Sequence, residues 1–326
     1  MSSEKPVQGA SAGSRVPDFF IVGQSKSGTT ALYEILARHP QIYMSRLKEP
    51  VFMASDLHAG LWATVRTRPR TLEQYLALFA DAQPKQCAGE ASSVYLWSCE
   101  AAANIAELAP NARIVAILRE PASFLRSLHL QMLQNHVETE KDFARAIALE
   151  PEREQGRRLP RGCPWPQALL YSQRVRYVEQ LRRYEQALGR EQMLVLVYDD
   201  FRAENEGTVR AVLRFLQLDD RLPIEAVEAN PTVLLRSKQL DELIHKASVG
   251  RGPAFSAVKA AVKAVTSREL RRRALGMRGR VLYSEPPPAD QRLMLELRRR
   301  FKPEVIALSE YLDRDLVNLW DYDSID

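Results

Sequence analysis

The chain has 326 residues, of which 45% are hydrophobic and 27% are charged, and its formal net charge is +5. The apolar share supports a large core, and the length fits either two average domains or one larger α/β domain. The small positive charge does not indicate a nucleic-acid partner, whereas it suits a site for anionic small molecules.

Signals for export and for membrane spans are absent from the sequence. No apolar run reaches the roughly 18 residues that a bilayer span needs, and residues 1–16 are small and polar without an apolar core. The three cysteines, Cys87, Cys99 and Cys163, lack metal-ligand spacing and indicate free thiols in a reducing compartment. We therefore expect a disordered tail over 1–16, one domain over 17–326, and a cytoplasmic protein.

Apolar runs alternate with helical patterns along the chain. Three runs have the pattern of buried parallel strands: 19–22, 113–118 and 192–197. Four stretches predict helices: 29–38, 121–135, 167–188 and 205–216. Strands separated by helices predict an α/β fold, with a central parallel sheet flanked by helices. Ligands of such sheets bind beyond the carboxyl ends of the strands, so the loops after Val22 and Leu118 are the first candidates for chemistry.

The loop over 23–30 joins the first predicted strand to the first predicted helix and has the composition of a phosphate site. Backbone N–H groups and the helix dipole favour an anion there. Gly28 permits close approach, Lys26 adds a full charge, and Thr29 and Thr30 add hydroxyl donors. The glycine spacing is that of a Walker A motif, but Thr29 stands where that motif has lysine. The expected fold is therefore a single-domain, P-loop-like one with an altered phosphate loop.

A second anchor follows the second predicted strand. Arg119 stands at the strand end, and Ser127 lies eight residues later in the following helix. Arginine supplies a planar fork of donors and serine one donor more, so the two can converge on one phosphate. Either residue alone is compatible with a structural role. Together with the loop at the neighbouring strand end, they indicate a second phosphate site.

These two segments resemble the sulfotransferases that use 3′-phosphoadenosine-5′-phosphosulfate (PAPS). The family's 5′-phosphosulfate loop commonly has the sequence KSGTT, which this chain matches at every position with Lys26-Ser27-Gly28-Thr29-Thr30. An arginine and a serine at the spacing of Arg119 and Ser127 hold the cofactor's 3′-phosphate in that family. The resemblance is nearer the bacterial and Golgi-type carbohydrate enzymes than the cytosolic aryl type, whose R-K-G-x-x-G-D-W segment is absent.

Four further segments are similar to family signatures: 47–52, 89–96, 195–218 and 308–320. The first matches K-E-P-x-F-F and the second G-E-x-S-P-x-Y-L, with Ser93 where proline is usual. The third has Asp199 for glutamate and Gln217 for glycine. The resemblance thus covers about residues 17–320, nearly the whole chain.

The resemblance implies transfer of a sulfuryl group from PAPS to a hydroxyl of a carbohydrate, a lipid or a secondary metabolite, with release of 3′-phosphoadenosine-5′-phosphate (PAP). Lys26 would neutralise the bridging oxygen, and no metal is expected because lysine, arginine and amides meet the cofactor's charge. Glu49 is the candidate general base, because Golgi-type enzymes use the glutamate of this segment. Such a base would need a pKa raised by partial burial. Glu90 and His129 are the alternatives.

Two other functions stay open. A P-loop kinase is disfavoured by Thr29 and by the absence of a strand-end aspartate for magnesium, and a nucleotide-binding regulatory protein without catalysis is disfavoured by Lys26 and Glu49. The segment 250–302 is rich in Lys and Arg. It forms either a solvated helix face or a surface for the cofactor, an acidic acceptor or, with a lipid acceptor, a membrane. No pattern names the acceptor or the oligomeric state.

Overall fold

The computed structural model describes residues 15–58, 68–160, 163, 166–224, 234–235, 283–284 and 288–325. Two sequence-based expectations concern residues that lie largely outside these ranges. The tail over 1–16 lies outside the described residues except for Arg15 and Val16, and so does most of the basic segment 250–302. Within the described ranges, no helix is both long and apolar enough to cross a bilayer.

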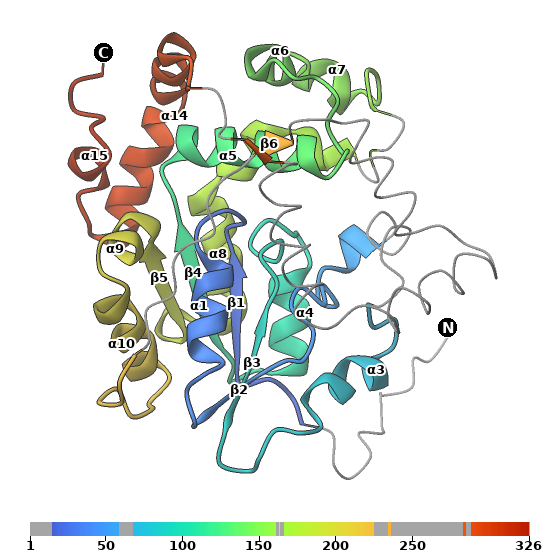
Figure 1. Cartoon of the computed structure of the whole chain (residues 1–326), viewed down its shortest axis with the longest axis vertical. Helices are drawn as coiled ribbons and strands as arrows, with labels where there is room; N and C mark the ends of the chain where they lie inside the picture. Colours follow the sequence, from blue (N-terminus) through green and yellow to red (C-terminus); the bar gives the residue numbers. More distant parts are fainter. Residues whose placement is uncertain are drawn as a thin grey trace, which may run out of the picture.

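A five-stranded sheet forms the centre of the molecule (Figure 1). Its strands are β1 (Phe19–Gly23), β2 (Ile42–Met44), β3 (Cys87–Ala91), β4 (Arg113–Leu118) and β5 (Met193–Val197), in the order β2-β3-β1-β4-β5. All four pairings are parallel. The predicted parallel sheet is thereby confirmed, and β1 lies in the middle of it with a partner on each side.

The strands β2 and β3 lie outside the predicted set. β3 has the sequence CAGEA, in which glycine and glutamate interrupt the apolar pattern that marks a buried strand. Gly89 is nonetheless required there, because a side chain at this position would meet the ring of Phe19 at 2.2 Å. The glycine makes room for a large core residue of β1. The sequence of β3 is therefore explained by its packing against β1 and not by an apolar pattern of its own.

Helices cover both faces of the sheet. They are α1 (Thr29–Leu36), α3 (Leu72–Leu76), α4 (Ala101–Leu108), α5 (Pro121–Gln134), α6 (Phe143–Ala148), α7 (Glu150–Glu154), α8 (Tyr177–Leu188), α9 (Tyr198–Ala203), α10 (Asn205–Phe215), α14 (Gln291–Leu312) and α15 (Leu316–Leu319). Single 3-10 turns connect them: η1 (Ser55–Leu57), η2 (Ala77–Phe79), η3 (Pro166–Leu169), η4 (Tyr171–Val175) and η5 (Arg190–Gln192). A separate antiparallel pair joins β6 (Leu234–Leu235) to β7 (Tyr283–Ser284).

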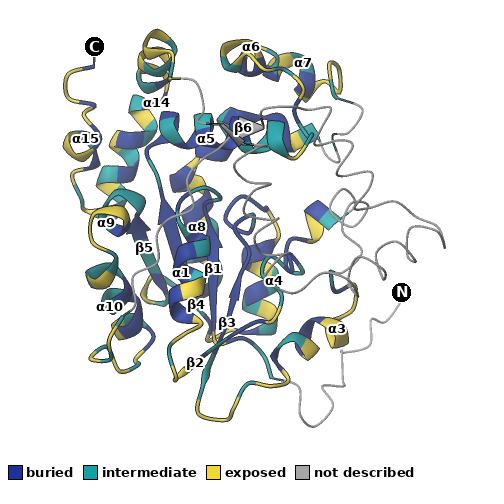
Figure 2. Cartoon of the chain, in the orientation of Figure 1, coloured by how far each residue is buried: buried dark blue, intermediate teal, exposed yellow. Residues whose placement is uncertain are grey.

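The side chains of β1 alternate between two hydrophobic cores. Phe20 and Val22 pack with residues of α4, α5, α8 and α14, whereas Phe19 and Ile21 pack with residues of α1 and α10. Successive side chains of a strand point to opposite faces, so a strand covered on both sides must be apolar throughout. Figure 2 shows the sheet buried along its length and the exposed residues on the outer helices.

The predicted helix over 167–188 is wrong in its first half. Residues 166–175 form the two 3-10 turns η3 and η4, and the α-helix begins at Tyr177. The carboxylate of Glu150 accepts hydrogen bonds from the Ser172 N–H (2.8 Å) and hydroxyl (2.5 Å). This tertiary contact satisfies a backbone donor that an α-helix would otherwise use. The contact with Glu150 therefore outweighs the helical pattern of the local sequence.

Candidate active site

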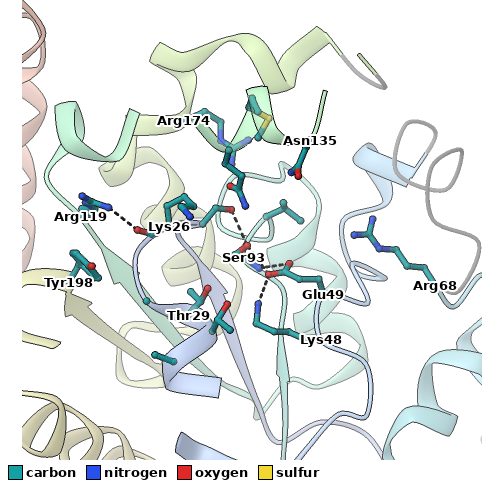
Figure 3. A pocket seen from close by; sticks show the side chains of 17 residues that line it. Lys26, Thr29, Lys48, Glu49, Arg68, Ser93, Arg119, Asn135, Arg174 and Tyr198 are labelled. Carbon is teal, nitrogen blue, oxygen red and sulfur yellow. Dashed lines mark hydrogen bonds and ion pairs between the residues drawn. The ribbon is translucent and has the colours of Figure 1, made fainter. Parts of the chain in front are cut away.

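A cavity of about 430 Å³ lies beyond the carboxyl ends of the central strands. Its walls come from the loop after β1, the segment after β2, the residues after β3, and the first residues after β4 and β5. The C-terminal end of α5, the turn η4 and Arg68, which precedes α3, complete it (Figure 3). Strand ends of a parallel sheet converge at one edge, so the sheet explains why residues far apart in sequence meet here.

The loop after β1 is held in place from behind the cavity. Gln24 is fully buried, and its Nε2 donates to the Arg174 carbonyl (3.0 Å) and to Gln180 Oε1 (2.9 Å). Gly28 then caps α1 with φ at 90°, and a side chain there would come within 2.9 Å of the Phe201 ring. Glycine is therefore required, and it directs the first amides of α1, Thr29 and Thr30 to the cavity wall.

Two cations from neighbouring strand ends border the cavity together. Arg119 Nη1 donates to the Lys26 carbonyl at 3.1 Å, and its guanidinium lies 4.9 Å from the centre of the Tyr198 ring. Burial lowers the pKa of the Lys26 ammonium, and the positive charge of Arg119 lowers it further. Within the described ranges, neither side chain has a carboxylate in ion-pair distance. Two neighbouring positive charges without a carboxylate partner in these ranges are suited to binding an anion.

Glu49 places a carboxylate on the same cavity. The Ser93 N–H donates to its Oε2, and the Ser93 hydroxyl and Lys48 Nζ both contact its Oε1, each at 2.9 Å. Because the single hydroxyl proton of Ser93 is used on Glu49, the 2.9 Å contact between Ser93 Oγ and Ser25 Oγ needs Ser25 as its donor. Figure 3 draws these contacts as a chain from the phosphate loop to the carboxylate.

Glu90 lies in β3, fully buried, and does not border the cavity. Its Oε2 accepts hydrogen bonds from the hydroxyls of Tyr75 (2.9 Å) and Tyr95 (2.8 Å). Burial raises the pKa of Glu90 to about 7, against the opposite effect of these hydrogen bonds. Tyr95 in turn accepts the Met53 N–H at 3.1 Å. Glu90 therefore supports the segment that carries Glu49 instead of contacting the cavity itself.

Two predicted residues of α5 also lie away from the cavity wall. His129 is buried, with ring nitrogens 3.1 Å from the Tyr171 hydroxyl and 3.3 Å from the Lys141 carbonyl. Burial lowers its pKa, which favours the neutral ring. Ser127 is buried as well and does not border the cavity. Ser27, within the loop, is fully buried and does not line the cavity. The predicted residues that do line the cavity are Lys26, Gly28, Thr29, Thr30, Glu49 and Arg119.

Several residues of the wall are absent from the sequence-based set: Arg68, Asn135, Arg174 and Tyr198. Tyr198 directly follows β5, so the strand-end rule applied to the third predicted strand would have found it. Arg174 lies in the turn η4, where the sequence predicts a helix. In the part of the chain that the structure describes, no group of three or more His, Cys, Asp or Glu side chains is placed to hold a metal ion.

Comparison with known proteins shows which family this chain belongs to. A model described as "Sulfotransferase family" matches residues 17–221. Human carbohydrate sulfotransferase 15 is 26% identical over 247 residues, which cover 62% of this chain and 44% of that protein. Mouse heparan sulfate glucosamine 3-O-sulfotransferase 3A1 is 29% identical over 119 residues, 36% of this chain and 27% of the relative. The chain thus spans less than half the length of these curated relatives.

A solved structure extends the comparison to the fold. The crystal structure of a sulfotransferase from Alicyclobacillus acidocaldarius superimposes with a TM-score of 0.65. The match covers 93% of this chain and 98% of that one, at 22% sequence identity. The two proteins therefore share a fold.

Proposed function

Because this chain belongs to the sulfotransferase family, we propose that it transfers a sulfuryl group from PAPS to an acceptor hydroxyl and releases PAP. One observation carries the proposal. A single cavity brings together the phosphate loop, Arg119 and the carboxylate of Glu49, which come from three different strand ends. Family membership, and Thr29 at the position of the Walker lysine, favour this reaction over a kinase or a regulatory protein without catalysis.

The chemistry of the donor set fits PAPS. The amides at the start of α1, with the hydroxyls of Thr29 and Thr30, suit the 5′-phosphate. Arg119 supplies a planar fork for the 3′-phosphate, and its stacking on Tyr198 limits the directions that the fork can take. Ser127 has only the family spacing as support, because its buried side chain does not border the cavity, so the proposal assigns the 3′-phosphate contact to Arg119.

When bound, PAPS supplies a sulfuryl group whose bond to the bridging oxygen breaks as the acceptor oxygen bonds to sulfur. The Lys26 ammonium then stabilises the negative charge that develops on the bridging oxygen. Its lowered pKa makes the ammonium a better proton donor toward that oxygen. The loop amides and threonine hydroxyls are already fixed by the buried contacts of Gln24, so they need little rearrangement as charge develops.

Glu49 takes the proton of the acceptor hydroxyl. Both of its oxygens already accept hydrogen bonds, and Lys48 pairs with one of them. These contacts hold the carboxylate in one orientation on the cavity wall, where it can receive the proton. Glu90 and His129 do not take this role in the proposal, because their buried side chains do not border the cavity.

The acceptor that we propose is a carbohydrate hydroxyl, which is supported by the carbohydrate and heparan sulfate enzymes among the relatives. We further propose a cytoplasmic location, supported by Cys87, Cys99 and Cys163, all of which are free thiols. Contact with a membrane surface would depend on the basic segment 250–302, most of which lies outside the described residues.

Calorimetric titration of the protein with PAP, and separately with ATP and magnesium, tests the donor. We expect PAP to bind more tightly than ATP, and Arg119→Ala to weaken PAP binding about tenfold or more, because a charge-assisted contact to phosphate is lost. Arg113→Ala is the matched control, since Arg113 begins the same strand and contacts the Leu216 carbonyl instead of the cavity. A preference for ATP, or equal PAP binding by Arg119→Ala and the original protein, would contradict the proposed donor.

A further inference from the structure

Arg174 is a buried arginine without an acidic partner. It lies in η4, is only 1% exposed, and yet borders the cavity. In the described part of the chain, its guanidinium makes no hydrogen bond or ion pair, and its Nε has no partner at all. Arg153 is the other buried arginine among the described residues, and it contacts both oxygens of Glu138 at 2.7 and 2.9 Å.

The charge of Arg174 persists in this environment. Burial lowers its pKa to about 10, which still leaves the side chain protonated near neutral pH. The guanidinium lies 4.1 Å from the centre of the Trp97 ring, and this aromatic face stabilises a cation without neutralising it. A buried charge that lacks a counter-ion is costly. The cost would be offset when an anion enters the cavity.

The position of Arg174 is fixed relative to the phosphate loop. Its carbonyl accepts hydrogen bonds from the Nε2 atoms of Gln24 (3.0 Å) and Gln180 (3.3 Å). Gln24 immediately precedes Ser25, which joins the loop to Ser93 and Glu49. In Figure 3, Arg174 lies on the same side of the cavity as Asn135, above Ser93, whereas Lys48 lies on the opposite side. Arg174 therefore borders a part of the cavity distinct from the Lys48–Glu49 pair.

We propose that Arg174 forms an oxyanion site in this cavity, in addition to the phosphate sites of the loop and Arg119. Its ligand is a single sulfonate or carboxylate group, which is either the sulfuryl group of the donor or an acidic group on the acceptor. This inference rests on the proposed function for the identity of the donor. The buried, unpaired guanidinium on the cavity wall is the observation behind it.

Three variants separate charge, shape and local stability. Arg174→Met keeps much of the side-chain volume and removes the charge, while Arg174→Lys keeps the charge and removes the planar fork. Arg183→Met is the matched control, because Arg183 donates to the carbonyls of Leu96 and Trp97 but does not border the cavity. Thermal melting of each variant shows whether it is folded.

Calorimetry with PAP, PAPS and inorganic sulfate then identifies the ligand. PAP lacks the sulfuryl group, so Arg174→Met should bind it within about twofold of the original protein. If the sulfuryl group is the ligand, binding of PAPS, and of sulfate to the PAP-saturated protein, should fall about tenfold or more. If an acidic acceptor is the ligand, PAPS binding should persist. A tetrasaccharide containing glucuronate should then bind about tenfold more weakly to the PAP-saturated variant, while neutral chitotetraose is unaffected.

The proposal is overturned if Arg174→Met matches the original protein with PAPS, sulfate and the acidic tetrasaccharide, or if it loses PAP as strongly as PAPS. Arg183→Met should change none of these titrations. If Arg174→Met does not fold, Arg174→Lys carries the test, and unchanged binding of all three anionic probes overturns the site. If the original protein binds neither PAP nor PAPS, the proposed function fails. Titration with sulfate alone then supports Arg174 if Arg174→Met abolishes binding, and opposes it if the original protein binds no sulfate.

Discussion

Ser93 donates hydrogen bonds to both carboxylate oxygens of Glu49, one from its N–H and one from its hydroxyl, each 2.9 Å long. The same hydroxyl accepts a hydrogen bond from Ser25 in the phosphate loop. The proposed base and the proposed donor site are therefore joined by one side chain. Proline, which is usual at this position in the enzymes that the chain resembles, has neither donor.

Substitution of Ser93 should affect the rate of transfer more than the binding of the donor. We expect Ser93→Ala to lower kcat about tenfold, because one hydrogen bond to a charged group is lost, and Ser93→Pro to lower it further, because both are lost. The KM for PAPS should change little. Steady-state kinetics with labelled PAPS, at several pH values, measures both constants. Equal kcat values in Ser93→Pro and the original protein would show that Ser93 does not position the base.

Lys26 should be required for transfer and less so for folding. Its φ of 62° lies in the left-handed region, which asparagine adopts more readily than most residues. Lys26→Asn therefore removes the charge with little backbone strain. We expect kcat to fall about a hundredfold or more, because the charge that meets the leaving oxygen is lost. Thermal melting serves as the control, and a folded Lys26→Asn with near-normal kcat would exclude Lys26 from catalysis.

Gly28→Ala should destabilise the protein by about 1–3 kcal/mol, because an alanine side chain would approach the Phe201 ring at a φ of 90°. Gly156→Ala is a matched control. Gly156 also has a positive φ, 76°, but a side chain there meets no atom within 4 Å. Urea unfolding of both variants separates backbone strain from the contact with Phe201. If the two lose equal stability, the contact contributes nothing.

The stability of the protein should depend on pH through Glu90. Burial raises the folded-state pKa of Glu90 from 4.5 to about 7, so between these values the folded state holds a proton that the unfolded state has lost. Its contribution to stability is therefore complete below about pH 4.5 and decreases as pH rises to about 7, by on the order of 3 kcal/mol. Glu90→Gln cannot titrate. Urea unfolding at pH 5 and pH 7.5 should show a smaller loss in Glu90→Gln than in the original protein, and parallel losses would contradict the assignment.

The sequence predicts those parts of the site that depend on local pattern. Arg119 directly follows an apolar strand and Lys26 lies three residues after another, and the edge of a parallel sheet brings such positions together. A helix that is buried on most sides, such as α5, does not reveal from its sequence which side chains reach the cavity. Ser127 and His129 are both buried in α5, and neither borders the cavity.

Other residues depend on tertiary contacts that have no local signature. Glu90 lies in a strand whose glycine is required by the neighbouring Phe19, and its own polar side chain is accommodated by Tyr75 of α3 and by Tyr95 in the loop after the strand. Arg174 lies in a turn that Glu150 stabilises from a distance of 22 residues along the chain. In both cases the partner, and not the local sequence, determines the structure.

The central place of β1 in the sheet also bears on the synthesis of the protein. The strand that carries the phosphate loop is made early, but its two neighbours, β3 and β4, begin at Cys87 and Arg113. The contacts that hold the loop come later still, since Gln24 binds Arg174 and Gln180. On the ribosome, a nascent chain that has not yet reached residue 180 should therefore have no competent donor site. Affinity for PAP would appear only when more than half of the chain has been made.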